Sequence, residues 1–300
     1  MATKNEITRW LNGIPYEVAF WNNVYRWENT FQGMMGWSHY GSPITLEDFE
    51  ANAFLVERAA PIVLDVGCGM SYATGNFLLQ DGQQVPLDIH YVDALAYHFN
   101  RILSKYKRNL PSIEFGMAEY LSAFYPDNYA DLVIIQNALD HSSRPMKAIY
   151  EALEVVKKGG VLYLNHHPNE AETEQYKGFH QNNIDEADGQ LIIWNKSERH
   201  IVNTLVSSFA EVKTSRYENG HIIAVITKKQ DVPCELLTRR EDIHELCDVV
   251  VQKSSSKPFG TAFKNRLLYM KYNFIQFFVQ SLSWENKMKL KKLIHQTPKQ

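Results

Sequence analysis

The fold of this 300-residue chain is decided by one stretch, Ile62-Val63-Leu64-Asp65-Val66-Gly67-Cys68-Gly69-Met70-Ser71. Its first five residues are apolar apart from one acid, which predicts a short buried strand in the middle of a parallel sheet. Gly67 and Gly69 then allow a sharp turn that a ligand can approach closely, because neither residue has a Cβ atom. We expect a helix after Ser71, over residues 72–80 and ended by Asp81-Gly82, with its free N–H groups facing the turn. Many nucleotide-binding folds contain such a turn, so it needs support from the rest of the chain.

Further strands alternate with helices downstream. We expect strands at residues 90–93, 113–115, 131–136 and 161–164, and helices at residues 95–108 and 144–157, the second of them ended by Gly159-Gly160. Two antiparallel strands at residues 211–217 and 221–227 follow, joined by the hairpin signal Asn219-Gly220. This alternation predicts an α/β fold with a doubly wound, mostly parallel seven-stranded sheet.

The segments around this sheet predict two appendages and one insertion. Residues 1–60 are rich in aromatic side chains at helical spacing and predict an N-terminal helical cap, with a last helix near 46–58. Two interpretations of its aromatic content stay open, core packing of an extra layer and a lid over a ligand pocket. Residues 61–229 form the main domain. Its polar insertion, at about 166–195, contains a short strand at 191–194 and precedes a helix near 197–208.

Residues 230–300 predict a helical, basic appendage, with helices at 238–251 and 260–280. From Lys253 to the end the chain has nine Lys and one Arg against one acid, although its overall net charge is −3. A basic amphipathic helix can lie on an anionic membrane surface. It can also dock on a partner or on the chain's own N-terminal layer, which is the commoner outcome.

Composition limits the partners and the compartment. An apolar fraction of 45% suits a globular protein, and the net charge of −3 gives no indication of a nucleic-acid partner. The cysteines Cys68, Cys234 and Cys247 are too far apart for a metal-ligand pattern and odd in number, which favours a reducing cytoplasmic setting. No apolar run reaches the roughly 20 residues of a membrane span, and the N-terminus lacks the pattern of a secretory signal. The oligomeric state stays open.

An acid ends the second predicted strand. Asp93, followed by Ala94, comes 28 residues after Asp65. In nucleoside-binding βαβ folds an acid at this place binds the ribose hydroxyls, because an ionised carboxylate accepts two O–H donors. The alternative is a surface acid at a helix N-terminus.

Together these motifs resemble the class I S-adenosylmethionine-dependent methyltransferases, over residues 55–228. The glycine turn matches the family's first motif, with Ser71 where many members have a third glycine. Met117-Ala118-Glu119 falls beside the adenine, with Met117 in place of an acid. Residues 131–141, which end in Asn137-Ala138-Leu139-Asp140-His141, resemble the fourth-strand motif, and Lys157-Lys158-Gly159-Gly160 resembles the entry to the fifth strand.

The resemblance implies S-adenosylmethionine as the cofactor. Matched by motif, its binding residues are Asp65, Gly67, Cys68, Gly69, Asp93, Ala94, Met117, Ala118, Glu119, Gln136 and Asn137. The aromatic N-terminal segment and Gly178-Phe179-His180-Gln181-Asn182-Asn183 resemble methyltransferases found with bacterial surface-polysaccharide genes. We therefore expect O-methylation of a sugar or sugar-derived small molecule. The alternatives are another small molecule or a lipid near a membrane, and a non-catalytic module that binds S-adenosylmethionine.

Three histidines are candidates for the base that a hydroxyl acceptor requires. His141 follows the fourth strand, His167 follows the fifth, and His180 lies in the insertion, all near the carboxyl ends of strands where open α/β sheets bind ligands. Each has a structural alternative, since loop histidines also stabilise turns. His166, His167 and Glu170 could bind a metal ion, but adjacent histidines of an extended chain point in opposite directions, so we predict no metal site.

Overall fold

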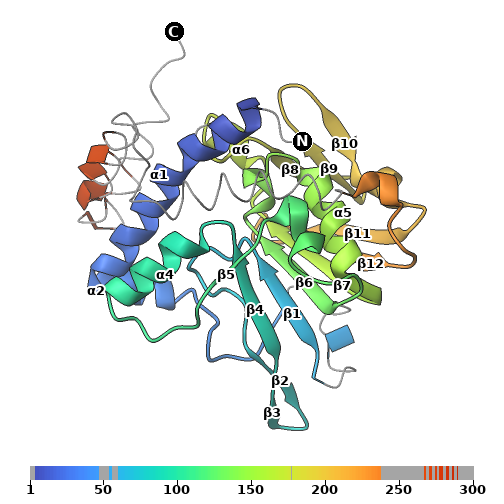
Figure 1. Cartoon of the computed structure of the whole chain (residues 1–300), viewed down its shortest axis with the longest axis horizontal. Coiled ribbons are helices and arrows are strands. Elements are labelled where there is room, and N and C mark those ends of the chain that lie inside the picture. The colour runs from blue at the N-terminus through green and yellow to red at the C-terminus, as the bar shows by residue number, and fades with distance from the viewer. Residues whose placement is uncertain are drawn as a thin grey trace.

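The computed structural model describes residues 4–46, 54–55, 60–176, 178–237 and scattered positions between 267 and 289 (Figure 1). The expected helix at 238–251, nearly all of the one at 46–58 and much of the one at 260–280 lie outside the described residues. Among the residues described, no helix combines the length and the apolar character needed to cross a membrane.

The centre of the molecule is the predicted seven-stranded sheet, in the order β11-β12-β7-β6-β1-β4-β5. Its strands are β1 (Ile62–Val66), β4 (Asp88–Asp93), β5 (Glu114–Phe115), β6 (Ala130–Gln136), β7 (Val156–His166), β11 (Ala210–Arg216) and β12 (Ile222–Lys228). All run parallel except β12, which is antiparallel to both of its neighbours. The prediction of a mostly parallel, Rossmann-like sheet is confirmed.

One face of the sheet packs on helices, and the other packs on Ile44, Leu46 and Leu55 of the N-terminal segment. Successive residues of β1 point to opposite faces, so Leu64 and Val66 pack in one apolar cluster and Val63 in another. The first face is covered by α5 (Pro145–Val155) and the 3-10 helix η1 (Ala118–Ala123). The remaining helical elements are α4 (Ala96–Lys105), α6 (Glu170–Thr173), α7 (Val202–Val206), η2 (Leu139–His141) and η3 (Cys234–Leu236).

The N-terminal segment is helical, as predicted. It forms α1 (Lys4–Arg26), which continues through Pro15, and α2 (Glu28–Met35). In Figure 1 these helices lie beside α4 at one end of the sheet. Trp21 and Tyr25 of α1 pack in one cluster with Cys68 and Met70 of the glycine turn. The cap is therefore part of the wall around that turn.

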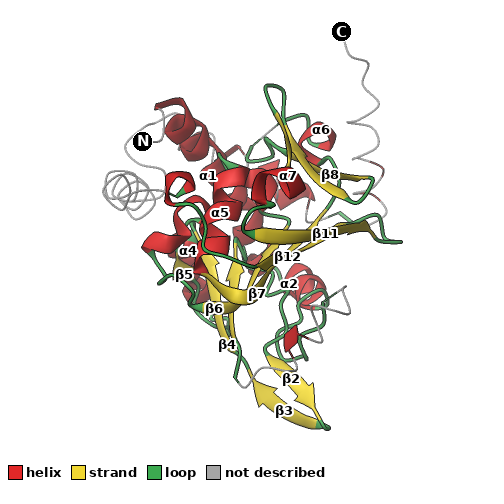
Figure 2. Ribbon diagram, turned by 90° about the vertical axis from the view of Figure 1, so that its right-hand side faces the viewer, coloured by secondary structure: helices red, strands yellow, loops and turns green. Residues whose placement is uncertain are grey.

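The helix predicted at residues 72–80 is wrong. A loop follows the glycine turn and leads into a hairpin of β2 (Phe77–Gln80) and β3 (Gln83–Pro86), which projects from the sheet in Figure 2. Asp81 and Gly82 both have positive φ, 49° and 77°, as a two-residue hairpin turn requires. Asp81-Gly82 therefore joins two strands, and its interpretation as a helix end is wrong.

Residues of the N-terminal segment donate hydrogen bonds to backbone carbonyls at the start of this loop. The Tyr25 hydroxyl donates to the Met70 carbonyl at 2.6 Å, and the His39 N–H donates to the Tyr72 carbonyl at 2.9 Å. These bonds fix the loop where a helix was expected, because buried carbonyls need donors.

The prediction that Gly159-Gly160 ends α5 is also wrong. The helix ends at Val155, and β7 begins one residue later and includes both glycines. A Cβ atom on Gly160 would lie 2.8 Å from the Asp131 carbonyl, next to the register shift in β6. Gly160 therefore lets β6 and β7 approach each other closely.

The insertion contains more strand than expected. A separate three-stranded antiparallel sheet consists of β8 (Asn183–Ala187), β9 (Gln190–Trp194) and β10 (Arg199–Ile201). Only its middle strand was predicted, and β10 and the short α7 occupy most of the stretch expected to be one helix. This small sheet packs on the α5 side of the main core through Ile184, Leu191 and Ile193.

Candidate active site

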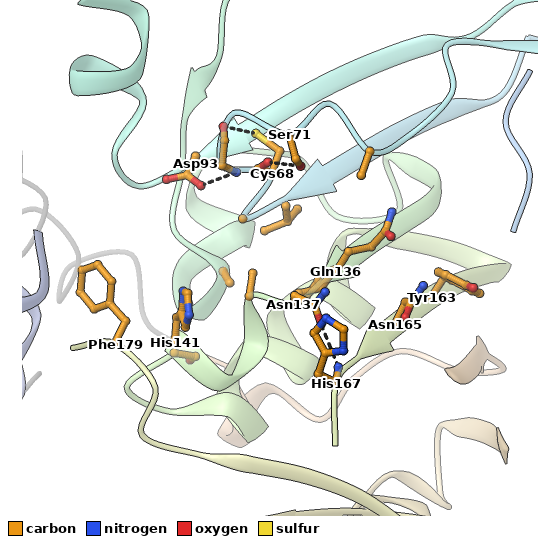
Figure 3. Close-up of a pocket in the computed structure, with 18 of the residues that line it drawn as sticks. Cys68, Ser71, Asp93, Gln136, Asn137, His141, Tyr163, Asn165, His167 and Phe179 are labelled. Atoms are coloured by element: carbon orange, nitrogen blue, oxygen red, sulfur yellow. Dashed lines mark hydrogen bonds between the residues drawn. The ribbon is translucent and has the colours of Figure 1, made fainter. Parts of the chain in front are cut away.

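A cavity of about 810 Å³ lies at the carboxyl ends of β1, β4, β6 and β7, and Figure 3 shows part of its lining. Nine of the predicted cofactor-binding residues line it: Gly67, Cys68, Gly69, Asp93, Ala94, Ala118, Glu119, Gln136 and Asn137. The volume falls within the range of cofactor pockets, about 300–1,000 Å³. The sequence motifs therefore converge on one space, although they lie at or just after the ends of four different strands, β1, β4, β5 and β6.

Two predicted cofactor-binding residues, Asp65 and Met117, are buried and do not line the cavity. Burial raises the pKa of Asp65 to about 7, although a hydrogen bond from Thr74 opposes the shift. Asp65 and Met117 therefore support the wall of the cavity from behind.

The glycine turn is held against the end of β4. The N–H groups of Gly67 and Cys68 both donate to the Val92 carbonyl, at 2.8 and 3.2 Å. Gly67 and Gly69 have positive φ, and Cβ atoms there would lie 2.5 Å from the Ala138 Cβ and 2.9 Å from the Trp21 ring. Both positions therefore require glycine for backbone conformation and for space.

The Asp93 carboxylate lies directly at this turn. Its Oδ2 accepts a hydrogen bond from the Gly69 N–H at 3.0 Å, and its Oδ1 accepts one from the Leu95 N–H at 2.7 Å. Burial raises the pKa of Asp93 to about 6, even though both N–H groups favour the ionised form. The acid and the glycine turn thus form one site, as the ribose-binding prediction requires.

Helix α1 and the segment after α2 close one side of the cavity. Glu17, Trp21, Trp37 and His39 line it, and the Trp21 indole N–H donates to Glu17 Oε1 at 2.9 Å. Trp21 also packs in the core of the cap. The aromatic segment therefore both packs as an extra layer and contributes side chains to the cavity wall. The sequence indicated the layer but not which aromatic side chains face the cavity.

Two of the three candidate bases meet at a buried acid, and we call Asp140, His141 and His180 the aspartate–histidine cluster. His180 Nδ1 lies 2.7 Å from Asp140 Oδ2. His141 Nε2 lies 3.2 Å from His180 Nδ1 and 3.5 Å from the same carboxylate oxygen. His141 lines the cavity, next to Phe179 in Figure 3. His180 does not line the cavity, but Phe179, which precedes it in the chain, and His141, which it contacts, both do.

The charges of this cluster support each other. Burial raises the pKa of Asp140, but the two histidines outweigh that effect, so its net pKa is lowered. Burial lowers the pKa of His180, but the hydrogen bond and charge of Asp140 outweigh it, so its net pKa is raised. Asp140 is therefore a carboxylate at neutral pH, and it favours positive charge on His180.

The polar motif in the insertion positions His180. The Asn182 side-chain amide donates to the Ser142 carbonyl at 2.7 Å and to the Asp140 carbonyl at 3.2 Å. The Gln181 N–H donates to the same Asp140 carbonyl at 3.2 Å. These bonds tie the insertion to the loop after β6, so two segments about forty residues apart share one site.

The third candidate base, His167, lies elsewhere on the cavity wall, in what we call the histidine pair, His167 and His221. Their ring centroids are 4.2 Å apart. His221 Nδ1 lies 2.8 Å from the Asn165 side-chain oxygen, to which it donates, and the His167 N–H donates to the Asn137 side-chain oxygen at 2.8 Å. The sequence reasoning missed His221. The sequence nevertheless contained a signal for it. Because β12 is antiparallel to β7, the residue that precedes β12, which is His221, must lie at the carboxyl end of β7.

The metal ligands considered from the sequence, His166, His167 and Glu170, do not come together. His166 is buried, which lowers its pKa to about 4, whereas His167 is exposed. Within the part of the chain that the structure describes, the aspartate–histidine cluster is the one set of three potential metal ligands whose donor atoms lie within 4.8 Å of one another. This grouping was not anticipated.

Fold and site define a class of protein. The seven-stranded sheet, the glycine turn at the end of β1 and the acid at the end of β4 are those of a Rossmann-like methyltransferase. Residues 64–164 match the family model described as "Methyltransferase domain". The protein is an S-adenosylmethionine-dependent methyltransferase, and S-adenosylmethionine is its cofactor.

The solved structures to which this chain is similar match it at low identity and low TM-score. A 16S rRNA N2 methyltransferase of T. thermophilus, in complex with AdoMet and guanosine, is 14% identical with a TM-score of 0.35. That match covers 64% of this chain but only 42% of the other. A SAM-dependent methyltransferase from Aquifex aeolicus is also 14% identical, with a TM-score of 0.34, and the match covers 58% of this chain and 84% of that one. No curated protein matches the chain.

Proposed function

We propose that this methyltransferase transfers a methyl group to a hydroxyl of a sugar or sugar-derived small molecule. One observation carries the proposal: the aspartate–histidine cluster adjoins the cavity that also holds the glycine turn and Asp93. A hydroxyl is a weak nucleophile until its proton is removed or its pKa is lowered. The cluster offers groups for that task beside the donor site.

The cavity fits S-adenosylmethionine. The ionised Asp93 is a candidate acceptor for the ribose hydroxyls, the loop from Gly116 to Glu119 for contact with the adenine, and the turn from Gly67 to Gly69 for close approach of the methionyl part. When bound, the cofactor supplies a methyl group on an electrophilic sulfonium. The residues of the chain contribute alignment, and proximity alone can lower a barrier by roughly 7–11 kcal/mol.

Polar side chains make the rest of the wall suitable for a polyhydroxylated acceptor. His39, Asn165, His167, Asn219 and His221 all line the cavity. Amide and imidazole groups donate and accept hydrogen bonds, which matches the mixed demands of sugar hydroxyls. With the resemblance of the N-terminal segment and the insertion, this wall favours a role in surface-polysaccharide biosynthesis.

A second candidate acceptor is a lipid near a membrane. Near the C-terminal end Leu267, Met270, Phe274, Ile275 and Phe278 are exposed, in a stretch rich in lysine. The Phe277 ring is also exposed in part, and it packs against Trp27 of the N-terminal layer, with ring centroids 5.6 Å apart. Liposome flotation with and without residues 253–300 separates the two outcomes. Equal flotation would dismiss the membrane and favour docking on the chain itself.

The test of the first proposal identifies the methylated atom. The full chain is incubated with labelled S-adenosylmethionine and a panel of nucleotide sugars, free sugars, phenols and amines. We expect transfer to a sugar of the panel, with an O-methyl signal in the carbon NMR spectrum of the product. Transfer to phenols or amines alone, with the sugars left unmodified, would overturn the proposal.

A further inference from the structure

The aspartate–histidine cluster has the geometry of a metal site. Three donor atoms of different residues, Asp140 Oδ2, His141 Nε2 and His180 Nδ1, point at one another with separations of 2.7, 3.2 and 3.5 Å. From this convergence we infer that the three residues bind a divalent transition-metal ion.

The separations agree with a shared ion. Ligand atoms about 2.1 Å from a metal, at tetrahedral or octahedral angles, lie about 3.0–3.4 Å apart. A circle through the three observed atoms has a radius of about 1.8 Å, which is shorter than the metal–ligand bond. A point about 1 Å outside their plane therefore lies at bonding distance from all three.

Hydrogen bonds alone leave this cluster incompletely satisfied. His180 Nδ1 lies within hydrogen-bond distance of both the Asp140 carboxylate and His141 Nε2, and a single N–H cannot serve both contacts fully. Asp140 is only 2% exposed, and its second oxygen, Oδ1, has no hydrogen-bond partner among the described residues. A buried carboxylate can accept about four hydrogen bonds, so this one is under-used. A cation compensates its charge directly.

The donor set selects the kind of ion. Two imidazole nitrogens and one carboxylate suit Zn²⁺, Mn²⁺ or Fe²⁺, whereas Mg²⁺ and Ca²⁺ prefer oxygen ligands. Three protein ligands leave at least one position open, as in catalytic zinc sites. Because His141 lines the cavity, this open position is near the space for the acceptor.

The ion also deepens the proposed function, on which this step rests. A hydroxyl bound to a divalent ion loses its proton far more readily than a free one. With an ion held by the cluster, the hydroxyl proton would pass to solvent, the acceptor oxygen would form a bond to the methyl carbon, and the bond from that carbon to sulfur would break to leave S-adenosylhomocysteine. No histidine of the cluster would then act as a free base.

The test measures metal content directly. The untagged full chain is freed of metal with a chelator, and the binding of Zn²⁺, Mn²⁺ and Mg²⁺ is measured by calorimetry and by elemental mass spectrometry. His180→Ala and Asp140→Asn each remove one ligand. His200→Ala is the matched control, because His200 pairs with Glu198 at 3.2 Å and its side chain is 29% exposed, against 28% for His180. Circular dichroism verifies that each variant is folded.

We expect one equivalent of Zn²⁺ in the wild type and in His200→Ala, and binding weaker by at least about 100-fold in the two ligand variants. Wild-type binding no stronger than that of His180→Ala, for all three ions, would overturn the inference. If the wild type binds no ion in this way but still transfers methyl groups to a sugar, the proposed function stands without the metal. Zinc binding without transfer to any sugar would support the metal site and count against the proposed function.

Discussion

The aspartate–histidine cluster and the histidine pair border the same cavity and differ in what surrounds their imidazoles. In the cluster, a buried carboxylate lies 2.7 Å from His180 and 3.5 Å from His141. In the pair, the nearest polar partner of His221 is the neutral Asn165 amide at 2.8 Å, and the ring of His167 stacks edgewise on that of His221. Figure 3 shows His141 and His167 apart on the wall.

This difference separates activation from recognition. A carboxylate raises the basicity of a histidine or completes a metal site, so the cluster can act on a proton. An amide orients an imidazole without charging it, so the pair is suited to hydrogen bonding with an acceptor. If this assignment is right, changes in the two groups affect different kinetic constants.

The largest effect is expected from Asp140→Asn. The substitution keeps the size of the side chain but removes the charge that the two histidines share. We expect kcat to fall by about 10²–10⁴-fold, the usual contribution of a positioned acid–base group. S-adenosylmethionine affinity, measured by calorimetry, should change by less than about threefold, because Asp140 does not line the cavity.

Glu198→Gln is the control for this prediction, since it neutralises another carboxylate beside a histidine, outside the cavity. It should leave kcat unchanged. A fall in kcat of less than about tenfold for Asp140→Asn would remove the contrast between the two histidine groups.

The next largest effect is expected on the donor side, by which we mean the part of the cavity formed by the glycine turn and Asp93, where S-adenosylmethionine binds. Both histidine groups act next to this same donor side. Asp93→Asn removes a charged acceptor for the ribose, and charge-assisted hydrogen bonds contribute about 1.5–3 kcal/mol. We expect the Kd for S-adenosylhomocysteine to rise by about 10- to 100-fold. Asp88→Asn, at the start of the same strand and exposed, serves as the control. Equal affinities for the two variants would argue against Asp93 as the ribose acceptor.

The donor side could be predicted from sequence because its parts are local. Short apolar runs indicated β1, β4 and β6, and parallel strands place their carboxyl ends at one edge. Asp93 could therefore be placed near Gly69 without coordinates, and the structure puts its Oδ2 3.0 Å from the Gly69 N–H. The match in sequence of Asp65 and Met117 to cofactor-binding positions did not show that both side chains are buried behind the wall.

The acceptor side depends on contacts between distant segments, which no local pattern encodes. The pairing of Asp140 with His180 is supported by Asn182, whose amide donates to the carbonyls of Asp140 and Ser142 about forty residues earlier in the chain. Trp21 reaches the glycine turn only because α1 packs on it. The hairpin of β2 and β3 was missed because an Asp-Gly pair such as Asp81-Gly82 can end a helix as well as join two strands. In the structure the exposed Leu79 follows the buried Leu78, which is the alternation of a strand.

A smaller effect is expected from the histidine pair. His221→Ala removes a ring that contacts His167 and hydrogen-bonds to Asn165, so it also loosens the orientation of both of these side chains. A bound sugar would therefore lose one or two hydrogen bonds of about 0.5–1.5 kcal/mol each. We expect the KM for the sugar acceptor to rise by about tenfold, with kcat nearly unchanged. His200→Ala, which lies outside the cavity, should change neither constant. If instead kcat fell by about 100-fold, the roles of the two histidine groups would be reversed.

The smallest effect is a pH dependence that arises on the donor side alone. Burial raises the pKa of Asp93 to about 6, so the carboxyl takes up a proton as the pH falls below neutrality. Ribose hydroxyls bind the ionised form, so ligand binding releases that proton. The affinity for S-adenosylhomocysteine should be constant above about pH 7 and fall by at most tenfold per pH unit below about 6. Calorimetry between pH 5 and 7.5, without an acceptor, measures it. Asp93→Asn should show a flat profile, and a wild-type profile that is equally flat would mean that another group holds the ribose.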